Sequence, residues 1–423
     1  MAPVPDIMRV LLVNPPIYDF TAYDFWLRPY GMLRVAGRIQ HACNLTFFDY
    51  LTSTRRDAWG RGRFFDQPVA KPALFHELAR RFRRFGRPRD EFKAFLNGQH
   101  FDLAMIQTSM TYWYPGVREV VEDLRRHAPG MRIILGGVYA TLCPAHARSL
   151  EVDLVVEGGN LEPLWRILPA PADSGPYRDP SMGDVAAMKL TDGCPFRCTY
   201  CAVPLLCPQF DARPAAECLQ EARSLARAGV RHIAFYDDAL LFRAGEALQP
   251  FLEGVMREQL RFSFHTPNAL NVRFLTPQLA QLMVQSGFCS FFLGLESTAS
   301  GWLQKTGGKL SAREFAAAVA CLRRAGAQFV TAYIIIGHPD TDAQEVETCM
   351  HFAHEQGLRI LLSEFAPVPG TIDGERCRQW VDLDEPLAHN KTAFTIRRLG
   401  ADEVKRLKSL CRSLNAALPA SWT

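Results

Sequence analysis

Three cysteines in one short segment constrain this chain more than any other feature. They lie in Cys194-Pro-Phe-Arg-Cys198-Thr-Tyr-Cys201, with three and then two residues between them. Cysteine thiolates are the usual protein ligands of iron–sulfur clusters, and a cluster of four irons normally takes four of them. Three cysteines therefore leave one iron open for a substrate or cofactor. Gly193 and Pro195 suit a loop that wraps its backbone around a bulky inorganic core.

A zinc site and simple buried thiols are the alternatives for these cysteines. Zinc usually takes four protein ligands, which commonly arrive as two separated pairs. The other cysteines are scattered along the chain, and no second closely spaced group occurs. The nearest, Cys207, could be a spare ligand, a catalytic thiol or a core residue. We therefore expect one iron–sulfur cluster, held by Cys194, Cys198 and Cys201, and no auxiliary cluster.

The cysteine motif resembles the signature of the radical S-adenosylmethionine (SAM) superfamily, C-x3-C-x-aromatic-C, with Tyr200 at the aromatic position. The resemblance extends from about Ala186 to Thr371. It implies that the open iron binds the amino and carboxylate groups of SAM. It also implies that one electron from the cluster splits SAM into methionine and a 5′-deoxyadenosyl radical. An external reductant such as flavodoxin or ferredoxin would supply that electron.

Apolar runs of strand length alternate with segments of helical spacing through most of the chain. In the first part they lie at 9–13, 45–48, 102–107, 131–135 and 153–156. In the second part they lie at 185–190, 231–236, 261–265, 290–295, 329–336 and 359–365. The pattern predicts an α/β protein with an N-terminal doubly wound (Rossmann-like) parallel sheet, a partial (β/α)6 barrel and a helical C-terminal tail.

The same pattern suggests where the domains begin and end. We expect a Rossmann-like domain at 1–165, a linker at 166–184, the barrel at 185–372 and a helical region at 373–423. An arginine-rich insertion at about 51–99 interrupts the first domain, with Arg80, Arg81, Arg83 and Arg84 close together. Arginine suits an anionic substrate or partner, and the alternative is a helix with a solvated basic face.

Functional side chains of a barrel lie at the carboxyl ends of its strands. Carboxylates and carbonyls suit the ammonium group of SAM, and a carboxylate can accept from ribose hydroxyls. The resemblance assigns the following positions to SAM: Tyr200, Tyr236, Asp237, Asp238, His265, Asn268, Glu296, Ile335 and Gly337. The alternative for each is a polar strand end or turn. His338 and the pair His389-Asn390 are further polar candidates, with turns and a plain loop as the alternative.

The N-terminal part resembles the cobalamin-binding domain that precedes many radical SAM domains. The matching pieces are 11–16, 108–109 and 135–141, and the candidate contacts are Asn14, Ser109, Tyr112, Trp113, Gly136 and Gly137. The D-x-H-x-x-G motif is absent, so we expect a cobalt without an imidazole ligand from that motif. Tyr112, Trp113 and Tyr114 would pack against the lower face of the corrin. The alternative is a sheet that serves only as a scaffold.

These features together predict a radical SAM enzyme with a 4Fe–4S cluster, SAM and, as a third candidate cofactor, cobalamin. With cobalamin, the expected reaction is methyl transfer to an unactivated carbon of a small-molecule or peptide substrate. One alternative is a cobalamin-independent radical rearrangement, cyclisation or oxidation. Another, of a different class, is a non-catalytic iron–sulfur sensor or binding protein.

Composition adds limits on location and partners. A net charge of +4 over 423 residues does not indicate nucleic-acid binding. No apolar run has the length of a membrane span, and the first residues lack the pattern of a secretory signal. A cluster with an open iron needs reducing conditions, so we expect a cytoplasmic protein.

Overall fold

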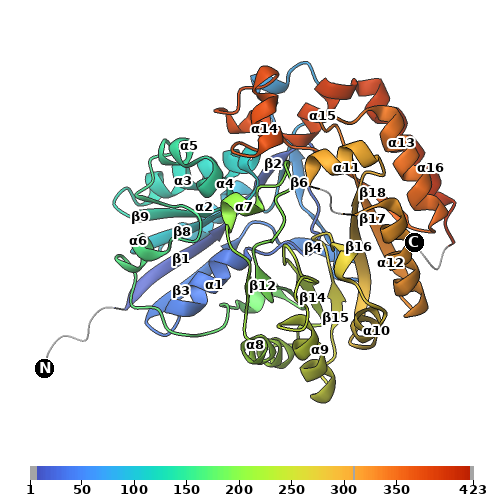
Figure 1. Cartoon of the computed structure of the whole chain (residues 1–423). Coiled ribbons are helices and arrows are strands. Elements are labelled where there is room, and N and C mark those ends of the chain that lie inside the picture. The colour runs from blue at the N-terminus through green and yellow to red at the C-terminus, as the bar shows by residue number, and fades with distance from the viewer. Residues whose placement is uncertain (1–6, 308–309, 420–423) are drawn as a thin grey trace, which may run out of the picture. The chain divides into compact units, whose positions relative to one another are not determined.

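The computed structural model describes residues 7–307 and 310–419, which fall into two compact units (Figure 1). The first unit comprises Met1–Gly183 together with Asp382–Asn390. The second comprises Asp184–Val381 and Lys391–Thr423. The C-terminal part of the chain therefore contributes a short segment to the first unit before it continues in the second.

The first unit is built on a five-stranded parallel sheet with the order β10-β9-β8-β1-β3. Helix α1 (Tyr30–Ile39) packs on the face that carries Val10 and Leu12, while α3 (Tyr114–His127) packs against β8. The strands are β1 (Met8–Asn14), β3 (Cys43–Asp49), β8 (Leu103–Thr108), β9 (Arg132–Gly137) and β10 (Leu154–Val156). Their apolar runs are buried, and the doubly wound fold predicted from the sequence is confirmed.

The strand order of this sheet changes direction between β1 and β8. From β1 the chain moves to β3 on one side, and later to β8, β9 and β10 on the other. In doubly wound sheets, ligands bind outside the carboxyl ends of the strands at such a point. Asn14 and Thr108 end the two strands there.

The arginine-rich insertion forms small antiparallel sheets, the short 3-10 helix η1 (Ala73–Phe75) and the helix α2 (Arg89–Leu96). Strand β7 (Arg83–Phe85) pairs with β2 (Ile17–Asp19) and β6 (Asp66–Pro68), and β4 (Ser53–Arg56) pairs with β5 (Gly62–Phe64). The interpretation of this arginine-rich stretch as a helix with a solvated basic face is therefore wrong. Arg84 is only 2% exposed. Its charge is compensated by Glu119, which lies 35 residues away in the sequence. Local periodicity does not reveal such a pair.

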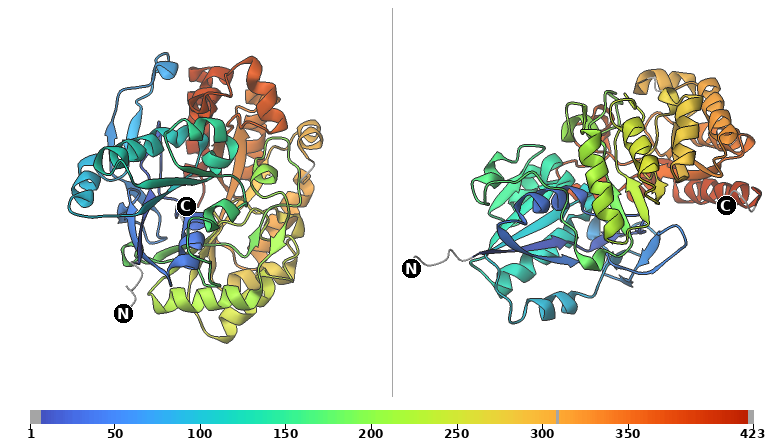
Figure 2. Two further views of the ribbon diagram at one scale, coloured as in Figure 1. Left: turned by 90° about the vertical axis from the view of Figure 1, so that its left-hand side faces the viewer. Right: turned by 90° about the horizontal axis from the view of Figure 1, so that it is seen from below.

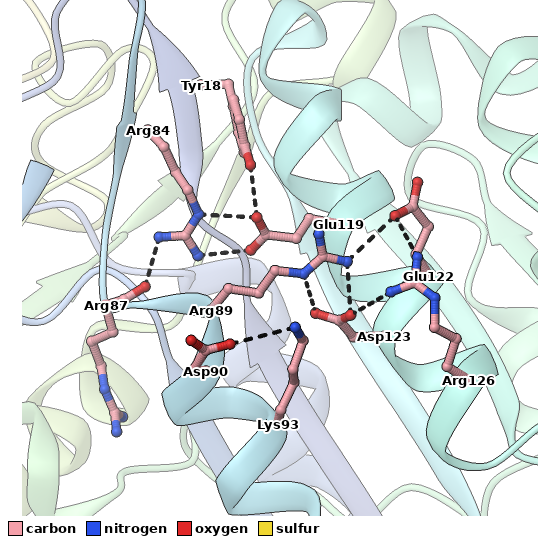
Figure 3. A network of polar contacts seen from close by, with 10 residues as sticks. All are labelled: Tyr18, Arg84, Arg87, Arg89, Asp90, Lys93, Glu119, Glu122, Asp123 and Arg126. Atoms are coloured by element: carbon pink, nitrogen blue, oxygen red, sulfur yellow. Dashed lines mark hydrogen bonds and ion pairs between the residues drawn. The ribbon is translucent and has the colours of Figure 1, made fainter. Parts of the chain in front are cut away.

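Buried ion pairs fasten the insertion to α3 (Figure 3). Arg84 donates from Nε to Glu119 Oε2 at 3.0 Å and from Nη2 to Glu119 Oε1 at 2.7 Å. The Tyr18 hydroxyl donates to the same carboxylate at 2.7 Å. One turn further along α3, Asp123 accepts from Nε and Nη2 of Arg89, both at 2.7 Å. Glu119 and Asp123 are buried, so these arginines are structural anchors.

The second unit is built on a six-stranded parallel sheet with the order β11-β14-β15-β16-β17-β18. The strands are β11 (Val185–Met188), β14 (His232–Phe235), β15 (Ser263–His265), β16 (Phe288–Glu296), β17 (Phe329–Ile336) and β18 (Arg359–Glu364). Each coincides with a predicted strand, as a partial barrel requires.

Helices cover the outer face of this second sheet (Figure 2). They are α8 (Ala215–Arg227), α9 (Leu248–Arg257), α10 (Pro277–Gln285), α12 (Ala312–Arg324), α13 (Ala343–Glu355) and α16 (Ala401–Ala416). Phe235, Leu293 and Ile334 are among the strand residues that form one core with these helices. Within the described ranges, the helices include none whose length and apolar character would let it cross a bilayer.

The segment Asp382–Asn390 ends in two buried side chains, His389 and Asn390, which contact the first unit. It contains the short helix η6 (Pro386–His389), and a ring nitrogen of His389 lies 2.9 Å from the Thr111 hydroxyl. Asn390 donates to Asp19 at 2.9 Å. The His-Asn pair is therefore part of the core of the first unit, and the alternative of a plain loop does not describe it.

Candidate functional site

The three cysteines lie on a loop that strands hold at both ends. The loop leaves β12 (Thr191–Asp192), which pairs with β13 (Asp211–Ala212) after the loop and α7 (Val203–Leu206). Gly193 has a φ of +76°, and a Cβ at this position would lie 2.1 Å from the Gln209 carbonyl oxygen. Only glycine fits there, because it lacks the Cβ. The backbone therefore turns sharply just before Cys194.

The donor chemistry of this loop fits a 4Fe–4S cluster with one open iron. Cys194, Cys198 and Cys201 form no disulfide, and thiolates are the ligands such clusters take. In the part of the chain that the structure describes, no three His, Cys, Asp or Glu side chains meet closely enough for a single metal ion. Ligands of a cluster bind separate irons of a larger core and do not need to converge on one point.

Helix α11 (Ser300–Thr306) packs against the cysteine loop. The Thr199 amide donates to the Thr306 carbonyl at 3.2 Å. A Cβ on Gly307 would lie 3.2 Å from Cys198 Cα, so the end of α11 closely approaches the loop backbone. The Tyr200 ring stacks on Trp302, with centroids 5.7 Å apart and planes at 22°. The aromatic position of the motif thus has a fixed orientation.

Glu296 shares a small pocket with this aromatic pair. The pocket is lined by Tyr200, Trp302, Gly294 and Glu296, among others. Glu296 ends β16 with a φ of +63°, where the pairing with β17 shifts register. A non-glycine residue in such a conformation costs about 1–3 kcal/mol, and strain of this kind clusters at functional sites. Burial, and then the charge of Glu296, raise the pKa of Tyr200 well above its ordinary value.

Asp237 supports the strand that leads into the cysteine loop. Its Oδ1 accepts from the Leu190 and Thr191 amides at 2.9 and 2.6 Å and from the Thr191 hydroxyl at 2.8 Å. Its Oδ2 is buried without a hydrogen-bond partner. Burial raises the pKa of Asp237 to about 7, although the Lys189 charge and the Thr191 bonds oppose the shift. Lys189 also contacts Asp238 at 3.1 Å.

Two other candidates connect neighbouring strands. Asn268 donates to the Tyr236 carbonyl at 3.0 Å, so it joins the ends of β14 and β15. His265 is fully buried, with one ring nitrogen 3.1 Å from His232 and the other 2.8 Å from the Ser290 hydroxyl. The structure therefore places His265 in a chain of polar side chains that crosses three strands.

The fifth strand ends in a tight turn against α15 (Lys391–Leu399). Ile335 is buried near the end of β17. Gly337 has a φ of +83°, and a Cβ there would lie 2.5 Å from the Thr395 hydroxyl oxygen. His338 follows, fully enclosed, and accepts from the Trp302 indole at 3.1 Å. Trp302 was not among the residues predicted from the sequence, because its only local signal is an aromatic residue on a short helix.

Several candidate cobalamin contacts are already engaged within the first unit. Asn14 donates to Asp49 at 2.8 Å, and the Trp113 indole donates to Asp19 at 2.9 Å. Tyr112 is 2% exposed. The Tyr114 hydroxyl donates to Glu385 at 3.2 Å. The aromatic residues after β8 are therefore held in place by the protein itself.

The glycine pair after β9 differs between its two members. Gly137 has a φ of +116°, and a Cβ there would lie 2.1 Å from the Thr108 carbonyl oxygen, so it is required by the fold. A Cβ on Gly136 would meet only the Val156 side chain, at 3.9 Å. Gly136 and Ser109 are both partly exposed. Because Gly136 has no side chain, its exposed surface is backbone at the carboxyl edge of the sheet.

Comparison with known proteins identifies the second unit. Residues 188–353 match the radical SAM superfamily. The chain is similar to the ribosomal protein uS12 methylthiotransferase RimO of Moorella thermoacetica, with 25% identity over 202 residues, or 44% of this chain and 45% of that protein. RimO of Nocardioides sp. is 28% identical over 271 residues, or 57% and 55% of the two chains. The chain thus spans about half the length of the curated relatives that it matches.

Solved structures resemble most of this chain in fold. The radical SAM methyltransferase TsrM from Kitasatospora setae, solved with cobalamin and a 4Fe–4S cluster bound, has a TM-score of 0.63 and 15% identity over 88% of this chain and 78% of its own. The cobalamin-dependent SAM radical enzyme OxsB, solved with aqua-cobalamin and SAM, has a TM-score of 0.57 and 12% identity over 96% and 61%. Residues 188–353 therefore form a radical SAM domain, and the chain as a whole resembles TsrM and OxsB in fold.

Proposed function

We propose that this chain is a cobalamin-dependent radical SAM methyltransferase that acts on an unactivated carbon. The observation that carries the proposal is the combination of two features in one chain. A doubly wound sheet with backbone accessible at Gly136 precedes a barrel with a three-cysteine loop. TsrM, which resembles 88% of this chain, was solved with cobalamin and a 4Fe–4S cluster bound.

Different residues of the second unit would hold the cluster and SAM. The cluster supplies one-electron reduction of SAM, and cobalamin supplies a methyl group. Cys194, Cys198 and Cys201 would hold the cluster. Glu296 lies in a strained conformation beside Tyr200, where a carboxylate can accept hydrogen bonds from ribose hydroxyls.

The strand ends beside the cysteine loop would receive the amino acid part of SAM. The carboxylate of Asp238 and the backbone carbonyl oxygens of Tyr236 and Asp237 can accept from an ammonium group. Asp237 would act mainly by positioning, because its Oδ1 already accepts three hydrogen bonds from Leu190 and Thr191. The partners would be a one-electron carrier and a small-molecule or peptide substrate.

Cobalamin-independent radical chemistry is a second candidate, and a specific observation favours it. Tyr112 is buried, and Trp113 is hydrogen bonded to Asp19 at the carboxyl edge of the first sheet. In this second candidate, these fixed side chains would take the place of a corrin instead of packing against it. A rearrangement, cyclisation or oxidation would need the cluster and SAM but no third cofactor.

Cobalamin binding separates the two candidates. Anaerobically purified protein is mixed with hydroxocobalamin, desalted, and assayed for cobalt and for the corrin absorption spectrum. We expect about one cobalt per chain, and a loss of binding in Gly136→Val, because its side chain would occupy the space that a nucleotide tail needs. Gly130→Val is the matched control, since Gly130 is exposed with open space around it, before β9 rather than after it.

One outcome would decide against methyl transfer by this route, and another against the placement of the ligand. Cobalt near zero in the unaltered protein would exclude it and favour the cobalamin-independent reaction. Full binding in Gly136→Val would contradict the placement of the ligand at the glycine pair. Formation of 5′-deoxyadenosine from SAM, measured in the same preparations, shows whether the cluster reaction persists independently of cobalt.

A further inference from the structure

A chain of hydrogen bonds joins the cysteine loop to the polar turns after β17 and β18. The Thr199 hydroxyl donates to Asp373 Oδ2. In return, the Asp373 amide donates to the Thr199 carbonyl at 3.0 Å. Asp373 lies in α14 (Ile372–Arg376) and is 2% exposed. Because Thr199 follows Cys198 directly, both bonds act on the part of the loop that carries the second and third cysteines.

His338 orients this carboxylate. One ring nitrogen, Nε2, lies 3.1 Å from Asp373 Oδ2. The other, Nδ1, faces the Trp302 indole N–H at 3.1 Å and the Asp340 amide at 3.2 Å. Both of these groups can only donate, so Nδ1 must accept. The ring proton therefore resides on Nε2, and His338 donates it to Asp373 as a neutral imidazole.

The carboxylate of Asp373 is ionised at neutral pH. Burial raises its pKa, but the bonds from His338 and Thr199 outweigh burial and lower the pKa to about 2. Its Oδ1 accepts from Arg376 Nη1 at 2.8 Å. Arg376 also binds both oxygens of Asp340 at 2.7 Å, so one half-exposed guanidinium serves two carboxylates. The group as a whole retains one negative charge next to the cysteine loop.

Tyr200 is held by the same chain. It stacks on Trp302, whose indole is fixed by its bond to His338. The His338 and Trp302 rings meet edge to face, with centroids 5.2 Å apart. The residue before Cys201 and the residue after Cys198 are therefore both tied to the His338–Asp373 pair.

We propose that Asp373, oriented by His338, is a positioning residue for the cluster. It holds the Thr199–Tyr200 part of the loop in one conformation and keeps a buried negative charge beside the metal site. Cluster potentials respond to nearby charge and to hydrogen bonds in the surrounding protein. This charge disfavours the extra electron of the reduced cluster and keeps its potential low. The inference rests on the proposed cluster assignment and holds whether or not cobalamin takes part.

The charge is tested by a pair of isosteric substitutions. Asp373→Asn removes the charge that faces the loop, and Asp340→Asn removes a charge that shares Arg376 but does not contact the loop. Both variants and the unaltered protein are reconstituted anaerobically with iron and sulfide. The midpoint potential is measured by a redox titration followed by electron paramagnetic resonance. We expect a more positive potential in Asp373→Asn and a smaller positive shift in Asp340→Asn, whose carboxylate does not contact the loop.

The hydrogen bond from the Thr199 hydroxyl to Asp373, which we call the tether, is tested separately. Thr199→Val keeps the shape but removes the hydroxyl, whereas Thr199→Ser restores it. Iron release to a chelator should be about tenfold faster in the valine variant, the factor that one lost hydrogen bond to a charged group corresponds to. The serine variant should release iron at the rate of the unaltered protein. This pair tests the positioning role of Asp373 even if Asp373→Asn does not assemble a cluster.

Distinct results would overturn each part. A full cluster with an unchanged potential in Asp373→Asn overturns the electrostatic role. Equal iron release from Thr199→Val and the unaltered protein overturns the tether. An unaltered protein that takes up no four-iron cluster overturns the cluster assignment itself, and the inference with it.

Discussion

Replacing Glu119 by glutamine should destabilise the first unit strongly. The side chain is buried against a buried Arg84, and the two form a bidentate pair with N–O distances of 3.0 and 2.7 Å (Figure 3). Glutamine keeps the shape but removes the negative charge and turns an N–H group toward the guanidinium. Removing one partner of a buried pair typically costs about 3–5 kcal/mol, because the remaining charge stays buried without compensation. Glutamine still offers one acceptor, so we expect a loss of about 3 kcal/mol.

The matched control is Glu122→Gln on the same helix. Glu122 is half exposed and contacts Arg89 and Arg126 at 3.4 and 3.2 Å. Exposed ion pairs contribute about 0–1 kcal/mol, so this variant should unfold at nearly the same urea concentration as the unaltered protein.

The assay must resolve the two units, because a protein of two units need not unfold in one step. Hydrogen exchange followed by mass spectrometry, at increasing urea concentration, reports each unit through its own peptides. Peptides from α3 at 114–127 should open at lower urea in Glu119→Gln, while peptides from α12 at 312–324 should not change. Equal effects of Glu119→Gln and Glu122→Gln would refute the reasoning.

Two further predictions follow from single positions. Gly137→Ala should lower the thermal stability of the first unit, because Gly137 has a positive φ and the added Cβ would lie 2.1 Å from the Thr108 carbonyl oxygen. The control variant Gly136→Ala should not lower it. Equal melting temperatures of the two variants would contradict this prediction. For Asp237, the folded pKa of about 7 lies above the ordinary 3.8, so the folded state holds a proton that the unfolded state has lost, and stability falls as pH rises from about 4 to 7. Asp237→Asn should therefore reduce that decline in urea titrations across this pH range, and an unchanged slope would contradict the shift.

The sequence predicted those parts of the protein that depend on neighbouring residues. Continuous apolar runs marked the strands of both sheets because a parallel strand buries both of its faces. The cysteine spacing and Gly193 marked the loop, since ligands and the sharp turn lie within a few residues of each other. The radical SAM assignment depended on these local features.

Features formed by distant partners were not predictable in the same way. Arg84 and Glu119 are 35 residues apart in the chain, so the arginine-rich stretch gave no local sign that it would be buried. His389 contacts Thr111 across 278 residues, and the return of the chain to the first unit has no periodic signal. Asp373 joins the cysteine loop across 174 residues. Each of these contacts depends on tertiary packing, which hydrophobic periodicity does not encode.

Reductive cleavage of SAM is the most direct test of the central claim that the three-cysteine loop makes this chain a radical SAM enzyme. Anaerobically reconstituted protein is incubated with SAM and dithionite, and 5′-deoxyadenosine and methionine are quantified by mass spectrometry. The triple variant with alanine at Cys194, Cys198 and Cys201 is treated identically. We predict that the unaltered protein forms both products in equal amounts and that the triple variant, with iron and sulfide near zero, forms neither. A full cluster retained in the triple variant, or no 5′-deoxyadenosine from an unaltered protein that holds four irons, would contradict the account.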